Sequence, residues 1–186
     1  MSENKKVNAA ILIIGNEILS GRTQDTNTST LATWLNSIGV KVSEVRVIPD
    51  IENTIVDTIN ILRKENDYVF TTGGIGPTHD DITASSVSKA FGRKYEIHKE
   101  AFKILESYYQ PGEFNEGRQR MVWMPENADL IYNPTSGAPG FSVENVFCLP
   151  GVPSIMKSML GGLKNKIVGG EPILSHTISL RTVESE

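Results

Sequence analysis

The sequence predicts an α/β fold in which a parallel sheet is covered by helices on both faces. Strand-like and helix-like patterns alternate along the chain. Two of the strand-like runs end in glycine-rich turns, and ligands of open α/β sheets lie outside such carboxyl ends. The chain has 186 residues, of which 39% are hydrophobic and 22% charged, so we expect a single globular domain over residues 1–186.

The first half of the chain contains the clearest elements. Buried or alternating apolar runs predict strands at Val7–Ile14, at Val40–Ile48 and at residues 68–70. Two amphipathic helices lie between these strands, the first ending at Gly39 as a C-cap and the second beginning after Pro49. Their apolar faces consist of Leu31, Trp34, Leu35 and Ile38, and of Ile51, Ile55, Ile59 and Leu62. The residues between 15 and 25 are expected to form a loop.

The second half is less regular. A helix with its apolar face on Phe102, Leu105, Tyr108 and Tyr109 is expected to end at Gln110-Pro111-Gly112. Residues 113–125 are assigned to no element; Arg118, Arg120 and Trp123 there are either phosphate and ring contacts or, as we favour, a solvated helix face with one half-buried Trp. Pro153 begins a last helix, and a strand is expected within residues 175–186. The core stripe of that helix is Ile155, Met156, Met159, Leu160 and Leu163.

The most informative segment is TTGGIGPTHDDIT at residues 71–83, which follows the third strand. Gly73, Gly74 and Gly76 free the backbone and let its N–H groups approach a ligand closely. Apolar residues at helical spacing follow Asp81, so the loop leads into a helix N-terminus, where unpaired N–H donors and the dipole favour anions. The segment therefore predicts a phosphate site.

Carboxylates beside this loop indicate a divalent cation. Asp80 and Asp81 would repel a phosphate unless a cation lay between them, and Mg²⁺ binds through one or two carboxylates plus phosphate oxygens. The alternative is that one Asp caps the helix and the other faces water. Asp50 follows the second strand and so lies at the same edge of the sheet. Glu17 is a further candidate ligand, and Asp25 is either another or the cap of the helix that Thr26 begins.

Several other kinds of site are excluded by their missing residues. A Walker A loop needs a Lys that is absent here, and a dinucleotide fingerprint needs Gly where His79 stands. His79, His98 and His176 have no His or Cys partner at ligand spacing, so no zinc site is expected. No Gly-x-Ser-x-Gly elbow supports serine hydrolysis.

Charge and composition limit the partners. A net charge of −4 without a block of Lys and Arg argues against nucleic-acid binding, and no apolar run reaches membrane-spanning length. The polar N-terminus lacks an export signal, so a cytoplasmic protein is expected. The lone Cys148 lies in an apolar strand-like run and is interpreted as a core residue rather than a nucleophile.

Five motifs occur in order along the chain, and together they resemble one known family. They are GNEIL at residues 15–19 with Gly21, Asp25 and Asn27; Asp50; the segment 71–83; Asn133-Pro134 with GAPGF at residues 137–141; and LPGVP at residues 149–153. This series resembles the molybdopterin-binding, or molybdenum cofactor biosynthesis, domain family. Within that family it is most similar to the N-terminal domain of the competence/damage-inducible (CinA) type.

The resemblance implies a three-layer α/β/α sandwich with a mostly parallel sheet, a pterin or nucleotide diphosphate ligand, Mg²⁺-type chemistry and a homo-oligomer. In the adenylyltransferase branch of the family, one aspartate follows the second strand and another closes the glycine loop; these match Asp50 and Asp81. CinA-like relatives are associated with hydrolysis of dinucleotides such as ADP-ribose, and a related domain accompanies FAD synthase. Relatives run on beyond the end of this chain.

Some residues depart from the family pattern. Ile155 stands where CinA-like relatives often have Glu, so no carboxylate there can act. Ile75 replaces the Thr of the adenylyltransferase branch, and His79 and Asp80 stand where that branch has a basic residue. These departures favour a dinucleotide over molybdopterin transfer.

The leading hypothesis is a divalent-metal enzyme acting on the phosphoanhydride of an adenylated small molecule, by hydrolysis or by adenylyl transfer. The alternatives are a molybdenum cofactor adenylyltransferase and a non-catalytic binding or scaffold domain. Asp50 and Asp81 are the predicted catalytic residues, and with Glu17 they are the predicted ligands of Mg²⁺ or another divalent cation. The predicted ligand and phosphate contacts are Gly15, Thr72, Gly73, Gly74, Ile75, Gly76, Pro77, Thr78, Gly137, Pro150 and Gly151.

Overall fold

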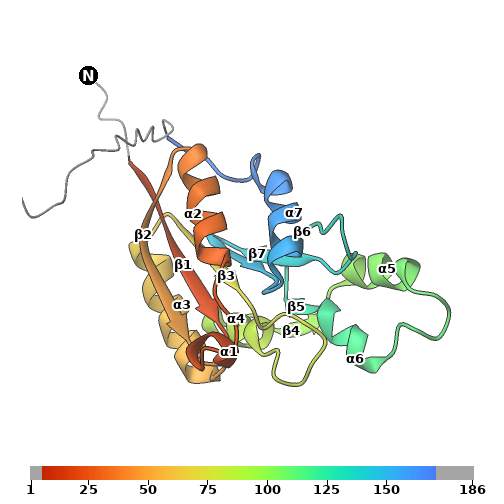
Figure 1. Cartoon of the computed structure of the whole chain (residues 1–186). Coiled ribbons are helices and arrows are strands. Elements are labelled where there is room, and N and C mark those ends of the chain that lie inside the picture. The colour runs from red at the N-terminus through yellow and green to blue at the C-terminus, as the bar shows by residue number, and fades with distance from the viewer. Residues whose placement is uncertain (1–5, 171–186) are drawn as a thin grey trace, which may run out of the picture.

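The computed structural model describes residues 6–170, and these form a sheet with helices on both faces (Figure 1). The three-layer α/β/α sandwich predicted for the chain is therefore confirmed, whereas the strand expected within residues 175–186 lies outside the described residues. In chain order the elements are β1 (Val7–Ile14), α1 (Asn16–Leu19), α2 (Asn27–Ser37), β2 (Val40–Ile48), α3 (Glu52–Glu65), β3 (Tyr68–Thr72), α4 (Thr83–Ala90), β4 (Tyr95–Ile97), α5 (Lys99–Tyr108), α6 (Glu116–Gln119), the 3₁₀ turn η1 (Arg120–Val122), β5 (Trp123–Pro125), β6 (Asp129–Ile131), β7 (Gly140–Val143), β8 (Val146–Leu149) and α7 (Pro153–Leu163).

The main sheet has six strands in the order β2-β1-β3-β8-β7-β6. The pairs β1–β2, β1–β3 and β3–β8 are parallel, and β7 and β6 continue the sheet in antiparallel fashion. Helices α2 and α3 make the crossovers between the first three strands, which is why these strands run parallel. Their carboxyl ends consequently meet at one edge of the sheet.

Strand β1 shows how the two cores form. Its side chains alternate between faces, as the two-residue period of a strand requires. Ala9, Ile11 and Ile13 pack in a cluster with residues of α2 and α7, while Ala10, Leu12 and Ile14 pack in another with residues of α3 and α4. Both clusters are buried, so β1 is apolar from Ala9 to Ile14 rather than alternating.

The region between β4 and β6 differs most from expectation. The segment 113–125, for which no element was predicted, contains α6, η1 and β5, and β5 pairs antiparallel with β4 in a separate two-stranded ribbon. Trp123 therefore belongs to a strand, so its placement on a helix face was wrong. Figure 1 shows the ribbon, α5 and α6 on the side of the molecule away from α3. A second local difference is that α1 forms within the expected loop between residues 15 and 25.

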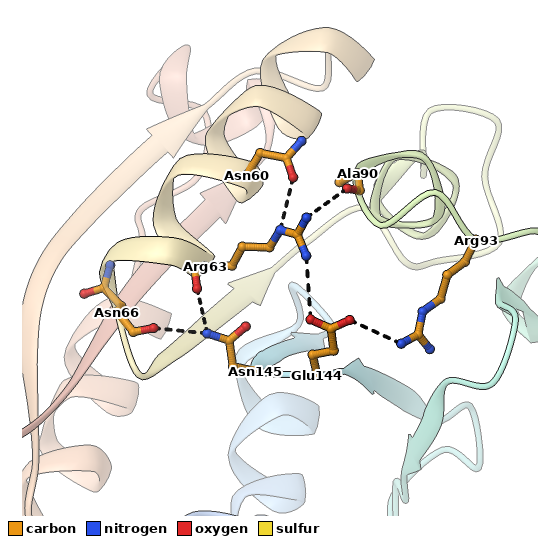
Figure 2. A network of polar contacts seen from close by, with 7 residues as sticks. All are labelled: Asn60, Arg63, Asn66, Ala90, Arg93, Glu144 and Asn145. Atoms are coloured by element: carbon orange, nitrogen blue, oxygen red, sulfur yellow. Dashed lines mark hydrogen bonds and ion pairs between the residues drawn. The ribbon is translucent and has the colours of Figure 1, made fainter.

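A polar network ties the β7–β8 turn to the helices beside it (Figure 2). The Glu144 carboxylate lies 3.7 Å from the Arg63 guanidinium and 3.5 Å from that of Arg93. Asn145 Nδ2 donates to the carbonyl oxygens of Arg63 and Asn66 at 2.9 and 3.0 Å. These bonds fix the end of α3, and with it the start of β3, against the sheet.

Within residues 6–170, none of the helices combines the length and apolar character that crossing a lipid bilayer requires.

Candidate functional site

The first motif and Asp50 meet at the carboxyl edge of the sheet. The Gly15 N–H donates to the Ile48 carbonyl oxygen at 3.1 Å, and the Asn16 N–H donates to Asp50 Oδ2 at 2.8 Å. The Glu17 carboxylate folds back over Gly15: a Cβ atom added at Gly15 would lie only 2.5 Å from Glu17 Oε1. The carboxyl ends of β1 and β2 thus bring Gly15, Glu17 and Asp50 together, as the parallel sheet predicted.

The glycine loop is held in place from both sides. Gly73 N–H donates to the Leu149 carbonyl oxygen at 3.2 Å, and Gly73 (φ 100°) passes so close to β1 that a Cβ atom there would lie 2.1 Å from the Ile14 carbonyl oxygen. Thr83, the first residue of α4, donates from its N–H to the Gly74 carbonyl oxygen at 2.9 Å and from its hydroxyl to that of Gly73 at 3.0 Å. Only glycine fits at position 73, since any side chain would displace the β1 backbone.

The loop presents free backbone donors. The N–H groups of Gly74, Ile75 and Gly76 donate no hydrogen bond to any residue between 6 and 170. All three residues are half-buried, and the N-terminus of the eight-residue helix α4 follows a few residues later. Consecutive free amides at such a position are suited to hold a phosphate.

Asp81 closes the loop rather than capping α4. Its Oδ2 accepts from the Thr78 N–H at 2.8 Å, and the Thr78 hydroxyl lies within hydrogen-bond distance of both the Asp80 and the Asp81 carboxylate. No side chain caps α4, whose N-cap residue is Ile82. The interpretation of one aspartate as the cap of this helix is therefore wrong. Gly76 lies directly against Asp81: a Cβ atom added at Gly76 would lie 2.7 Å from Asp81 Oδ2.

Asp50 lies in a negatively charged environment. Partial burial is the main reason why the pKa of Asp50 is raised above its ordinary value, and the hydrogen bond from Asn16 opposes that shift. Three neighbouring carboxylates raise the pKa further: Glu17, Asp80 and Asp81. The hydrogen bond from Thr78, in contrast, lowers the pKa of Asp80. Asp50 and the loop carboxylates thus repel one another, which a bound cation would relieve.

The donor set fits a cation that is held partly by its ligand. Within residues 6–170 no three His, Cys, Asp or Glu side chains stand close enough to form a metal site by themselves. Mg²⁺ commonly binds through one or two carboxylates and completes its shell with phosphate oxygens and water. Asp50 and Asp81, with Glu17 nearby, suit that mode, and their role as metal ligands stays a prediction.

Two small cavities flank the glycine loop. One, of about 50 Å³, is lined by Glu17, Asp25, Asn27, Thr72 and Gly151 among others. Asn27 Nδ2 donates to the Gly151 carbonyl oxygen at 2.9 Å and to the Thr72 hydroxyl at 3.4 Å. Asp25 Oδ1 accepts from the Asn27 and Thr28 N–H groups, so it fills the capping role that was one of its two predicted alternatives.

The other cavity contains Tyr95, which the sequence did not indicate, and two residues for which a phosphate or ring contact was the less favoured alternative, Arg120 and Trp123. It is a crevice of about 10 Å³ in which Ile75, Gly76 and Asp81 of the loop lie beside Arg120, Trp123 and Tyr95. A cation and a Trp in the unassigned segment 113–125 were the only signal, and a solvated face was the preferred interpretation. Arg118, in contrast to Arg120 and Trp123, does not line this crevice and fits the solvated helix face. Its guanidinium lies 4.3 Å from the centre of the Tyr109 ring, and its Nη1 donates to the Glu113 carbonyl oxygen.

Of the remaining predicted ligand contacts, four lie beside the glycine loop, and Gly137 packs on helix α5 instead. Pro77 and Thr78 are exposed in the loop, and Pro150 and Gly151 follow β8 directly, where Gly151 packs on the Gly73 backbone. Gly137 (φ 74°) packs against the Tyr108 ring, which lies 2.8 Å from where its Cβ would be. Its position indicates a turn packed on α5, and its role as a ligand contact stays a prediction.

Known proteins of one family are similar to this sequence. A family model described as a probable molybdopterin binding domain matches residues 10–172. A protein of Archaeoglobus fulgidus is 37% identical over 161 residues, which cover 87% of this chain and 69% of that protein. A CinA-like protein of Citrifermentans bemidjiense is 38% identical over 157 residues, which cover 81% of this chain and 38% of that protein. The chain thus spans only part of the length of these relatives.

Solved structures agree with the fold. The crystal structure of CinA from Thermoplasma acidophilum, a protein described as of unknown function, has a TM-score of 0.81 and 32% identity, with 88% of this chain and 99% of that chain covered. The molybdopterin biosynthesis enzyme MoaB from Thermus thermophilus has a TM-score of 0.57 and 16% identity, with 84% and 89% covered. At that identity the second likeness shows a shared fold alone.

Proposed function

The chain belongs to the molybdopterin-binding domain family, of the type found in CinA-like proteins, and from this membership we propose that it is a metal-dependent enzyme acting on a diphosphate. The ligand would be a nucleotide or pterin whose phosphoanhydride is cleaved, as in an ADP-ribose or FAD pyrophosphatase. The observation that carries this proposal is the set of free amides of Gly74, Ile75 and Gly76 beside Asp50 and Asp81.

Each part of the site has a chemical task in this proposal. The free amides would hold one phosphate group and stabilise the charge that develops on its oxygens in the transition state. Asp50 and Asp81 would hold the divalent cation, which supplies polarisation of a phosphoryl oxygen and a lowered pKa for bound water. A bound cation would offset the burial and the neighbouring carboxylates that raise the pKa of Asp50.

Two other functions remain as alternatives. Adenylyl transfer to molybdopterin would use the same phosphate cradle, and Ile75 and His79 are the residues that weigh against it by resemblance to that branch. A non-catalytic binding or scaffold domain would keep the cradle without turnover. A homo-oligomer and a cytoplasmic location are further expectations drawn from the family and from the sequence.

The proposal is tested by incubating the protein with Mg²⁺, Mn²⁺ or Co²⁺ and a panel of ADP-ribose, FAD, NAD, and ATP plus molybdopterin. Release of AMP or pyrophosphate from at least one member, stopped by EDTA, is expected. Turnover that persists in an Asp50→Asn/Asp81→Asn double variant would refute the assigned metal ligands. Tight binding of a panel member without turnover under any metal would instead favour the scaffold alternative.

For the single variant Asp81→Asn we expect loss of about 10- to 100-fold or more in metal-dependent turnover. The free energy of unfolding should change by less than about 0.5 kcal/mol, because an Asn side chain can still accept from the Thr78 N–H. Asp129→Asn, at an exposed carboxylate on β6, is the matched control and should leave both quantities unchanged. A large loss of stability in Asp81→Asn would show that Asp81 is structural.

A further inference from the structure

One face of the β4–β5 ribbon is apolar and exposed. The register places Ile97 opposite Trp123 and Tyr95 opposite Pro125. Tyr95, Ile97 and Trp123 retain 39%, 40% and 37% exposure, whereas Met124, on the other face of β5, is 2% exposed. The Tyr95 and Trp123 rings pack together, with 5.4 Å between their centres. The ribbon thus anchors β5 in the core through Met124 and leaves an aromatic face open.

This aromatic face adjoins the phosphate loop. Tyr95 and Trp123 line the same crevice as Gly76 and Asp81. The crevice is only about 10 Å³, too small to enclose a ring, so a flat group would lie across its rim rather than inside it. A ligand with one phosphate on the loop amides would carry its next groups toward these rings.

The Arg120 guanidinium lies at the same crevice and has no ion-pair partner among residues 6–170. It lines the crevice, is exposed, and forms no ion pair or hydrogen bond with residues 6–170, unlike Arg63, Arg93 and Arg118. Its charge acts on Tyr95, whose pKa is raised by burial and held down by Arg120. An unpaired guanidinium beside a phosphate loop is suited to a second phosphate group.

We propose that the β4–β5 ribbon is the base platform of the site, with a purine ring stacked on Trp123 and Tyr95 and Arg120 bound to the phosphate nearest the base. This inference rests on the proposed function and assigns the residues that would hold the base of its substrate. Aromatic side chains bind bases through their flat faces, whereas the loop amides recognise only phosphate. The ribbon, not the glycine loop, would therefore hold the base.

The fluorescence of Trp123 can report on ligand binding to the platform. The chain has one other Trp, Trp34, which packs edge-on against Phe70. A Trp34→Phe variant makes Trp123 the sole Trp without altering the platform. Titration with ADP-ribose or AMP in the presence of Mg²⁺ should quench its fluorescence, and ribose 5-phosphate, which lacks a base, should not. This measurement needs no substitution in the platform.

Affinity measurements complete the test. Trp123→Ala should weaken ADP-ribose binding by about 5- to 100-fold and leave ribose 5-phosphate binding unchanged. Arg120→Ala should weaken ADP-ribose binding, because it removes the contact to the phosphate nearest the base. Tyr132→Ala, at an aromatic residue that is 60% exposed, is the matched control and should change neither.

The outcomes separate this inference from the proposed function. ADP-ribose that binds and turns over with no Trp123 quenching and an unaltered affinity in Trp123→Ala would overturn the platform and leave the proposed function intact. Failure of every purine compound to bind would overturn both. A change of oligomeric state in Trp123→Ala, with ADP-ribose affinity retained, would show that a second copy of the chain covers this face, and would also overturn the platform.

Discussion

Glycine serves the candidate site in two different ways. Gly74 has φ of 68°, a left-handed conformation that other residues adopt at a cost, and a Cβ atom there would lie 2.2 Å from Thr83 Oγ1. Gly76 is not left-handed, but its Cβ would lie 2.7 Å from Asp81 Oδ2. The first glycine is thus required by the backbone, and the second by the carboxylate that closes the loop.

Alanine at these two positions should affect different properties, stability at position 74 and turnover at position 76. Gly74→Ala should lower the free energy of unfolding by about 1–2 kcal/mol from the left-handed backbone alone, with the Thr83 contact adding to it. Gly76→Ala should leave stability nearly unchanged, because the Asp81 side chain can move aside, yet reduce metal-dependent turnover roughly tenfold or more. Urea unfolding and initial rates distinguish the two. Equal stability losses in both variants would contradict the division.

The Asp50 carboxylate should cost the folded protein stability at neutral pH. Its pKa is raised in the folded state, so the folded protein becomes less stable as pH rises through that pKa. Asp50→Asn should therefore raise Tm at pH 7 while abolishing turnover, and the gain should shrink as pH falls and Asp50 becomes protonated. Thermal unfolding of both proteins without metal, from about pH 4 to pH 8, measures this. If the increase in Tm did not depend on pH, the negative charge of Asp50 would not be its cause.

The end of helix α3 depends on a residue from a distant turn. Side chains beyond the helix satisfy the carbonyl groups at the end of α3: Asn66 Nδ2, at the C-cap, donates to the Leu62 carbonyl oxygen at 3.0 Å. Asn145, in the β7–β8 turn, donates to the carbonyl oxygens of Arg63 and Asn66 (Figure 2). Glu144 beside it (φ 51°) joins the network only through ion pairs, and its side chain is more than half exposed. The hairpin and α3 are thus held together mainly by the Asn145 amide.

Asn145→Ala should lower the free energy of unfolding by about 1–3 kcal/mol, because it leaves two partly buried carbonyl oxygens without a donor. Glu144→Gln should cost less than about 1 kcal/mol, since exposed ion pairs contribute little. Chemical denaturation of both variants measures the difference, and neither should change turnover. If Glu144→Gln proved the more damaging substitution, the ion pairs would hold the turn instead.

The sheet as a whole places strand β8 at the centre of the molecule, between β3 and β7. Its Cys148 has no solvent exposure, and burial raises the pKa of the thiol to about 12. The interpretation of Cys148 as a core residue is therefore confirmed. Because the thiolate is the reactive form, this thiol reports on opening of the whole sandwich rather than on the site.

Cys148 should react with a thiol reagent such as DTNB only through unfolding. We expect negligible labelling of the native protein over minutes at pH 8, and one thiol per chain in concentrated urea. The native labelling rate should rise in the destabilised Asn145→Ala variant and stay unchanged in Asp81→Asn. Rapid labelling of the native protein would show that β8 is accessible without global unfolding.

Local patterns along the chain were enough to predict the class of fold, the bounds of β1 and β2 and the meeting of Gly15, Asp50 and the glycine loop. These features depend on side-chain period, on turn chemistry and on the rule that parallel strands end at one edge. Each is encoded within a few neighbouring residues.

The tertiary structure alone decided which other residues reach that edge. Arg120, Trp123 and Tyr95 come from η1, β5 and β4, which are short elements without a clear period, and their pairing joins segments far apart in the chain. Asn145 at the end of α3 is a second case. Contacts of this kind depend on packing between elements, and packing leaves no periodic signal in the sequence.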